Sequence, residues 1–453
     1  MTRWRPASDA QADQALELLS IGVSHRSKAV AAFSTVVEWY DFTLYLYLAT
    51  ILSRVFFGGG EGSLASTLAG FAVAYLMRPL GALVFGHIGD RYGRRTTMLL
   101  SMALMTAAML ATALLPTYDQ IGPAAGWALL LLRCVMSFSV GGEYTGVVAY
   151  LLEGARRERR GLVTSLAAAS SEVGALLAAA VSALTVASMS SADLDAWGWR
   201  VPFFVGAVLA GSVWVARSWM EETPDFERQR AQQSVPKSPL RYTLQHHRRG
   251  IGRGFAISAL GSITYYVGIT YVPAFLTTVA SLGEGDALWL STAAAMSVIA
   301  ITPVTGLLSD RVGRRPVLIA VAISSAALPM VMFAWMADGS MVRALAGAVV
   351  LALVGGAVSA VGAVSTAEQF PGEGRLTGLA LGATSATAIF GGLTPLVAQQ
   401  LIERTGWPLV PGAMIAAVAL LVLPVLLTMP ETRGRADQPD PLLLTRSDSP
   451  EHP

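Results

Sequence analysis

Charged residues and cysteine are both scarce in this sequence. Only 14% of its 453 residues are Asp, Glu, Lys or Arg, whereas a soluble globular chain carries about 25%. The one cysteine, Cys134, rules out an intramolecular disulfide. The net charge is only +2 and no basic block is interleaved with aromatic residues, so we expect no nucleic-acid partner. Metal-ligand spacings and a G-x-x-x-x-G-K-[ST] phosphate loop are also missing, so we expect no metal, no cofactor and no enzymatic or ATP-driven activity.

Apolar residues are correspondingly abundant, at 53% of the chain, and the mean hydropathy is +0.54. A membrane-spanning helix needs about 20 mostly apolar residues. Runs of this kind predict an all-α membrane protein with twelve transmembrane helices. The predicted spans are 30–56, 66–87, 96–116, 125–152, 161–187, 199–219, 251–279, 287–308, 316–337, 342–366, 376–402 and 408–429.

Basic residues are concentrated in alternate connections between the predicted helices. The stretches PTYDQIGPA, MSSADLDAWG, SLGEGDA and ADGS contain no Lys or Arg, whereas the connections between them are rich in Arg. The positive-inside rule therefore places both termini in the cytoplasm, which requires an even number of helices. The polar N-terminal stretch has no apolar core followed by a small-residue cleavage site, so we expect a solvated tail rather than a signal peptide.

Residues 85–95 and 305–315 are two copies of one loop, FGHIGDRYGRR and TGLLSDRVGRR, each after the second helix of a set of six. Parallel halves with nested inverted repeats are a known transporter architecture, with the substrate site near the bilayer midplane. We therefore predict a cytoplasmic N-terminal tail (1–29), an N-terminal six-helix bundle (30–219), a cytoplasmic central loop (220–250), a C-terminal six-helix bundle (251–429) and a disordered cytoplasmic tail (430–453).

The repeated loop has the composition of a cytoplasmic gate. Its glycines allow a tight turn and its arginines hold the loop in the cytoplasm. Asp90 and Asp310 lie at helix ends, where each can pair with an Arg or with the positive N-terminus of a neighbouring helix. A pair that forms in only one conformation would act as a latch; the alternative is a basic turn that only sets topology. The predicted gate residues are Asp90, Arg91, Arg94, Asp310, Arg311, Arg314, Glu368 and Arg375.

Charged residues inside the predicted helices are candidates for function, because a charge near the bilayer centre costs about 2.5–3.5 kcal/mol. One face of the first helix carries Ser34, Glu38, Asp41 and Tyr45. Two neighbouring carboxylates in a low-dielectric interior can bind and release protons, so Glu38 and Asp41 are predicted to couple transport to protons. The alternative is that they are structural partners of Arg78 or Arg133.

Further candidates lie on other predicted helices. A guanidinium matches a carboxylate, so Arg78 or Arg133 could hold an anionic substrate or neutralise an acid of the first helix. Glu143 and Glu172 are predicted to take part in proton coupling, although Glu172 is equally compatible with an interhelical hydrogen bond. Aromatic and hydroxyl side chains near residue 266 suggest a cavity wall, or ordinary core packing. The predicted substrate-binding residues are Arg78, Arg133, Tyr45, Tyr266, Thr270 and Thr384.

Both loops resemble the G-x-x-x-D-R-x-G-R-R signature of the major facilitator superfamily. The chain further resembles its metabolite:proton symporter family, which includes permeases for proline and betaine, 2-oxoglutarate, shikimate and citrate. The matching stretches are VVEWYDFTLY (36–45), RPLGALVFGHIGDRYGRR (78–95), FSVGGEYTG (138–146), RRGLVTS (159–165), ETPDF (222–226), TYVPAFL (270–276), EQFPGEGRLTGLALG (368–382) and AIFGGLTP (388–395).

The resemblance implies alternating access and proton-coupled import of a small organic anion or zwitterion across a bacterial inner membrane, by a multi-pass protein expected to be a monomer. It also implies a proton-coupling role for Arg133. The sequence departs from the family at RCVMS (133–137), where Met136 replaces the common Gln, and at GAT (382–384), where many relatives have Gly-Tyr-Asn. An exporter of the same fold that works by proton antiport is the alternative function, and a solute sensor is a third.

Overall fold

The computed structural model describes residues 23–60 and 63–434, and within these ranges every regular element is helical. The larger parts of the two predicted tails, 1–22 and 435–453, lie outside the described residues. The helix α2 begins at His25, five residues before the first predicted span.

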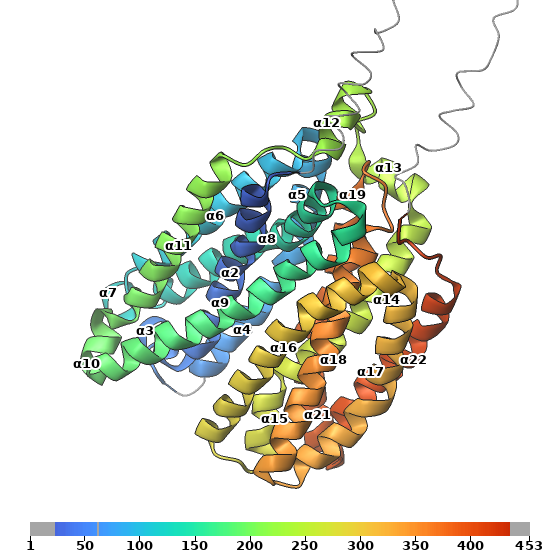
Figure 1. Cartoon of the computed structure of the whole chain (residues 1–453). Coiled ribbons are helices and arrows are strands. Elements are labelled where there is room, and N and C mark those ends of the chain that lie inside the picture. The colour runs from blue at the N-terminus through green and yellow to red at the C-terminus, as the bar shows by residue number, and fades with distance from the viewer. Residues whose placement is uncertain (1–22, 61–62, 435–453) are drawn as a thin grey trace, which may run out of the picture.

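The first half of the chain forms helices coloured blue to green in Figure 1. They are α2 (His25–Tyr47), α3 (Ala49–Phe57), α4 (Ser63–Tyr75), α5 (Met77–Tyr92), α6 (Arg94–Ala113), α7 (Tyr118–Ile121), α8 (Ala124–Gly154), η1 (Arg157–Arg159), α9 (Arg160–Ser188), α10 (Ser191–Asp193), η2 (Leu194–Gly198) and α11 (Arg200–Ser218). The predicted central loop is partly helical, with α12 (Pro224–Ala231) and α13 (Pro239–His246), each of which begins with a proline in its first turn.

The second half, coloured yellow to red, lies beside the first. Its elements are α14 (Arg248–Tyr265), η3 (Tyr266–Thr270), α15 (Val272–Thr278), α16 (Glu284–Val312), α17 (Arg314–Ala337), α18 (Met341–Ala367), α19 (Arg375–Leu379), η4 (Ala380–Thr384), α20 (Ser385–Thr387), η5 (Ala388–Gly392), α21 (Thr394–Thr405) and α22 (Val410–Thr428). The η3, η4 and η5 segments are single π-helical turns inside otherwise α-helical rods.

Nine helices of the described residues are long and apolar enough to cross a bilayer, and they coincide with nine of the predicted spans. A tenth is the pair α14–η3 and α15, which bends by 41°. The predicted spans 30–56 and 66–87 do not pass as single helices. The first is divided at Leu48 and carries charges in α2, and the second is divided at Leu76 into α4 and α5, of 13 and 16 residues.

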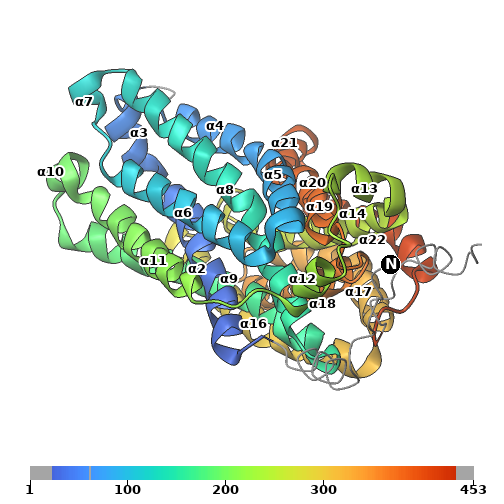
Figure 2. The ribbon, with the colours of Figure 1, turned by 90° about the horizontal axis from the view of Figure 1, so that it is seen from above.

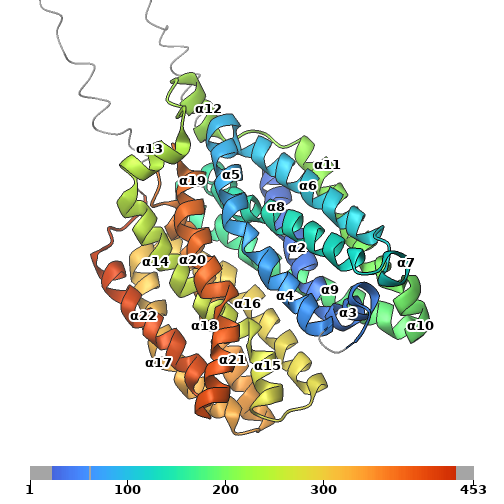
Figure 3. The same cartoon turned by 180° about the vertical axis from the view of Figure 1, so that it is seen from behind.

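Each half has its own hydrophobic core. One large buried cluster is drawn from residues 37–213 and the other from 256–429. The halves meet along α9 and α16, and α5 lies against α19 (Figures 2 and 3). Within the first half, α5 and α8 approach so closely that a Cβ at Gly81 would lie 1.8 Å from the Phe138 carbonyl oxygen. This glycine contact brings the charged side chains of α5 and α8 next to those of α2.

Candidate functional site

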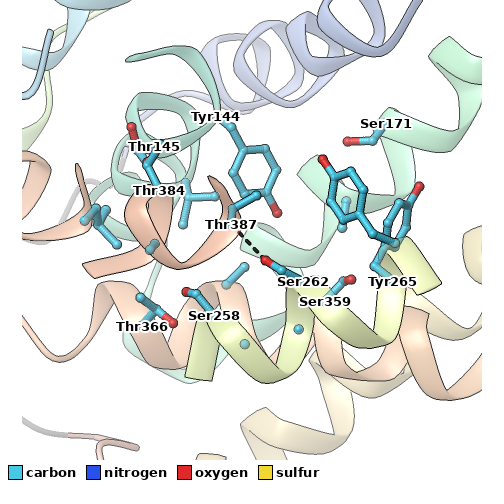
Figure 4. Close-up of a pocket in the computed structure, with 18 of the residues that line it drawn as sticks. Tyr144, Thr145, Ser171, Ser258, Ser262, Tyr265, Ser359, Thr366, Thr384 and Thr387 are labelled. Carbon is cyan, nitrogen blue, oxygen red and sulfur yellow. Dashed lines mark hydrogen bonds between the residues drawn. The ribbon is translucent and has the colours of Figure 1, made fainter. Parts of the chain in front are cut away.

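A cavity of about 190 Å³ lies between the two halves. The first half contributes wall residues from α2, α4, α5, α8 and α9, and the second contributes them from α14, η3, α16, α18 and the segment from α19 to η5. Figure 4 shows how hydroxyl groups from both halves surround the space: Tyr144, Thr145, Ser171, Ser258, Ser262, Tyr265, Ser359, Thr366, Thr384 and Thr387. The predicted site residues Tyr266 and Thr384 also line it.

The charged side chains that line the cavity are Glu38, Arg78 and Glu172. Glu38 Oε1 lies 3.7 Å from Arg78 Nη1, which is an ion pair but too long for a hydrogen bond. The guanidinium of Arg78 also lies over the rings of Tyr75 and Phe42, at 4.5 and 5.2 Å from their centroids. Stacking therefore holds Arg78 in place at the cavity wall.

Two side-chain contacts at the cavity wall join the halves. The Tyr265 hydroxyl of α14 donates to Glu172 of α9. The hydroxyls of Tyr75 and Tyr266 are 2.8 Å apart, and their rings meet edge to face. Both contacts must break if the halves move apart on this side of the molecule. Glu172 and the tyrosines therefore link what binds in the cavity to whether the cavity opens.

The pair Asp41 and Arg133 lies behind the cavity rather than in its wall. Arg133 Nη1 donates to Asp41 Oδ2 over 2.8 Å, and both side chains are buried. They line a second cavity of about 20 Å³, to which Glu38 and Arg78 also belong. Tyr45 packs against the Arg133 guanidinium, 5.3 Å from its ring centroid, and donates its hydroxyl to the Thr67 carbonyl.

Glu143 does not reach the cavity, because it is fully paired inside the first half. It forms a salt bridge with Arg217 of α11 and accepts a hydrogen bond from Ser101 over 2.7 Å. Arg217 also donates to Ser34, one of the residues on the α2 face. Arg217 was not predicted as a site residue, although it is an arginine inside the predicted span 199–219. Thr270, predicted to bind substrate, is exposed and does not line the cavity.

The predicted gate residues meet at the end of the molecule that carries the two repeated loops, here called the signature end. Asp90 of α5 accepts hydrogen bonds from the backbone N–H groups of Leu376 and Thr377, at the start of α19 in the other half. Asp310 of α16 accepts them in the same way from Gly161 and Leu162, at the start of α9. Each loop acid therefore binds a helix N-terminus of the opposite half.

Arginines complete the two networks. Arg94 lies 3.5 Å from Asp90 and 2.9 Å from Glu153, and Arg314 lies 2.8 Å from Asp310 and 3.1 Å from Glu368. Arg375 crosses between the halves to Glu153, over 2.7 Å. Glu153 was not predicted.

The exposed members of the loops lie outside these networks. Arg91 is exposed; it donates to the Lys237 carbonyl over a long 3.4 Å and lies over the ring of its neighbour Tyr92. Arg311 is also exposed, and its backbone carbonyl accepts from Arg433. These two positions have the least support as gate residues.

A glutamate outside the membrane-spanning segments binds the last two residues of each repeated loop, where the next helix begins. Glu222 accepts from the backbone N–H groups of Arg94 and Arg95, and Glu431 accepts from those of Arg314 and Arg315. Burial raises the pKa of Glu222 despite these bonds. Burial has the same tendency at Glu431, but there the backbone donors outweigh it and lower the pKa.

The fold and the cavity between two helical halves define a membrane transporter. The sequence matches the sugar (and other) transporter family over residues 28–437, so the chain belongs to that family of the major facilitator superfamily and is not an enzyme.

Characterised relatives include proton-coupled carriers. The chain is 30% identical over 429 residues to the proline/betaine transporter of Escherichia coli K12, covering 92% of this chain and 86% of the relative. It is 32% identical over 387 residues to the citrate-proton symporter of Klebsiella pneumoniae, covering 85% and 87%. The solved structure of the proton:xylose symporter XylE with 6-bromo-6-deoxy-D-glucose has the same fold, with a TM-score of 0.78, 19% identity and coverage of 91% and 97%.

Proposed function

We infer that this protein is a proton-coupled symporter that imports a small organic solute across a bacterial inner membrane by alternating access. In this proposal twelve transmembrane helices form two six-helix bundles, 30–219 and 251–429, with the central loop and both termini in the cytoplasm. The protein works as a monomer. A relative that is a proton symporter and the symporter-type set of matching stretches support this assignment over a proton-antiport exporter.

The observation that carries the proposal is the loose ion pair between Glu38 and Arg78 at the wall of the cavity. A proton on Glu38 removes its negative charge and leaves the Arg78 guanidinium available for a substrate carboxylate. Loss of the proton restores the competing partner and favours release. Proton and substrate binding are therefore coupled through one arginine.

The charges of the cavity favour a zwitterion over a di- or tricarboxylate. Its wall contains one guanidinium but two carboxylates, those of Glu38 and Glu172. A tricarboxylate would be repelled by these acids and would lack further cationic partners. A zwitterion can place its carboxylate on Arg78 and its cationic end near Glu172 and the tyrosine rings, which attract quaternary ammonium groups. The proline/betaine relative is consistent with this choice.

The decisive experiment is uptake of radiolabelled glycine betaine, L-proline, 2-oxoglutarate and citrate into proteoliposomes with an imposed pH gradient, acid outside. We expect concentrative uptake of the zwitterions, loss of accumulation with a protonophore, and proton entry when substrate is added. Proton exit on addition of substrate would instead identify an antiporter, and uptake insensitive to the protonophore would refute proton coupling.

Replacing the acid tests the residue assignment. Glu38→Gln is expected to abolish accumulation against a gradient, because an amide cannot exchange a proton, while substrate exchange continues. Glu158→Gln, at an exposed position in η1, is the matched control and should transport normally. Full concentrative uptake by Glu38→Gln would remove this residue from the proton route.

A further inference from the structure

The small cavity behind the main one holds several charged atoms that have no protein partner. Its wall includes Glu38, Asp41, Arg78 and Arg133, and its volume is about 20 Å³. Glu38 Oε2 and Asp41 Oδ1 accept no hydrogen bond, and Arg133 Nε and Nη2 donate none, within the part of the chain that the structure describes. Glu38, Asp41 and Arg133 are each at most 4% exposed. Such groups are costly to bury without a partner.

The unpartnered atoms are complementary to one water molecule. A buried water needs about 10–15 Å³ of accessible space and two to four polar partners, both of which this cavity provides. Its two hydrogens can be donated to Glu38 Oε2 and Asp41 Oδ1, and its oxygen can accept from Arg133 Nη2. A metal cation fits poorly, because a guanidinium presents only N–H donors.

We propose that this cavity is a water site that joins Glu38 to Asp41, so that the two carboxyls form one proton relay between the substrate cavity and the buried Asp41–Arg133 pair. The inference rests on the proposed proton-coupled function. Glu38 lies in the walls of both cavities. Glu38 and Asp41 are three residues apart on α2, which places their side chains on the same helix face.

The relay balances without any other reactant. The O–H bond of protonated Glu38 breaks as its proton passes to the water, and a different proton of that water forms an O–H bond on Asp41. The water is restored. Glu38 then carries the negative charge and faces Arg78, while Asp41 becomes neutral and its salt bridge with Arg133 loses its ionic partner. Only one proton resides on the two acids at a time.

The charged groups around the relay lie on three neighbouring helices, α5, α8 and α11. Arg78 of α5 and Arg133 of α8 face the carboxyls directly. Glu143 and Arg217 also interact electrostatically with Glu38, but they carry opposite charges and are paired with each other, so their effects on Glu38 oppose one another. The phenols that interact with the relay acids are Tyr144 for Glu38 and Tyr40 and Tyr45 for Asp41. None of these groups occupies the place of the bridging water.

A crystal structure of the full-length protein, at a resolution where buried waters are seen, tests the site directly. We expect one water within about 2.7–3.2 Å of both Glu38 Oε2 and Asp41 Oδ1. A dry cavity, a sodium ion in it, or a direct contact between the two carboxyls would overturn the proposal. This test does not depend on transport.

A cavity-filling variant tests the relay in function. Ala74 lines the small cavity but not the main one, so Ala74→Val is expected to displace the water and to reduce pH-driven glycine betaine uptake at least tenfold. Exchange of internal for external glycine betaine should stay within twofold of wild type, which shows that the variant folds and binds. Ala74→Ser, which retains a polar lining, is the matched control and should keep coupled uptake.

The two proposals fail in different ways. If wild-type protein couples uptake to protons and Ala74→Val does so equally well, the relay is wrong and the symport function stands. If wild-type protein transports without protons, the symport function is wrong, and the crystallographic water alone decides whether the site exists.

Discussion

At the scale of single residues, the interior of the first half contains a buried ion pair, Glu143 and Arg217, that we expect to stabilise the fold. Both side chains are fully buried; Glu143 also accepts a hydrogen bond from Ser101, and Arg217 also donates to Ser34 and to the Met98 carbonyl. Removing one member of such a pair leaves an uncompensated charge, which costs about 3–5 kcal/mol. We therefore expect Arg217→Met to lower the stability of the purified protein by this amount.

A double variant separates a structural role of Glu143 from a role in proton coupling. The double variant Glu143→Gln/Arg217→Met removes both charges and should recover most of the lost thermal stability, together with concentrative uptake. Recovery of stability without recovery of proton coupling would return Glu143 to the proton route. Thermal unfolding in detergent and uptake driven by a pH gradient provide the two readouts.

Arg78 gives a second prediction at this scale. Its planar fork can donate two hydrogen bonds to a substrate carboxylate, whereas Lys is a point charge. Since a hydrogen bond to a charged group contributes about 1.5–3 kcal/mol, Arg78→Lys should raise the KM for glycine betaine about 10- to 100-fold. The exposed Arg91→Lys should leave KM unchanged within twofold. Equal KM values for the two variants would show that Arg78 does not bind the carboxylate.

Several of these residues could be predicted from the sequence because a charge in an apolar run is conspicuous. Glu38, Arg78 and Glu172 stood out in this way and do line the cavity. The pairing of Glu143 could not be predicted, since its partner Arg217 lies 74 residues away at the end of a helix, where an arginine usually extends to the membrane surface. Thr270 lies in the π-helical turn η3 and does not line the cavity, whereas Tyr266 in the same turn does.

At the scale of helices, the N-terminus of α17 is capped by a residue more than one hundred positions away. Glu431 accepts from the first two N–H groups of α17, at 2.8 and 3.0 Å. We expect Glu431→Gln to destabilise the protein by about 1 kcal/mol at pH 7, the usual contribution of a helix cap.

The pH dependence follows from the lowered pKa of Glu431. A carboxyl whose pKa is lower in the folded than in the unfolded state stabilises the protein above about pH 5 and loses this contribution as the pH falls through its folded value. The difference in melting temperature between wild type and Glu431→Gln should therefore shrink below about pH 4. A difference that is constant from pH 7 to pH 3 would contradict this account; the exposed Glu158→Gln is the control.

The sequence predicts where most helices occur, but it does not predict where they are interrupted. Nine predicted spans coincide with long helices because each contains a run of high mean hydropathy that is long enough to cross a bilayer. The breaks at Leu48 and Leu76 occur at apolar residues that carry no sequence signal. The π-helical turns η4 and η5 are likewise invisible to periodicity, since one extra residue per turn alters the pattern only locally.

At the scale of the whole molecule, the two halves are held together at the signature end by contacts that repeat. Asp90 and Asp310 each bind a helix N-terminus of the other half. Next to Asp310, Gly161 of α9 and Gly306 of α16 face each other so closely that a Cβ on Gly161 would lie 2.5 Å from the Gly306 carbonyl oxygen. The added Cβ is bonded directly to the backbone of α9, and the oxygen belongs to the backbone of α16. Neither atom can rotate away, so a side chain at Gly161 can be accommodated only if the halves separate.

Gly161→Ala should therefore shift the protein toward a state that is open at the signature end. Overpacking costs about 1–3 kcal/mol, enough to change the ratio of two states about fivefold or more. In a Cys134→Ser background, a cysteine at Ser258 in the cavity wall should react about tenfold faster with an impermeant maleimide applied from that end. Gly252→Ala, where a Cβ meets no atom within 4 Å, is the control. Equal labelling rates in both variants would mean that this glycine contact does not hold the signature end closed, and the gate would then depend on the loop acids alone.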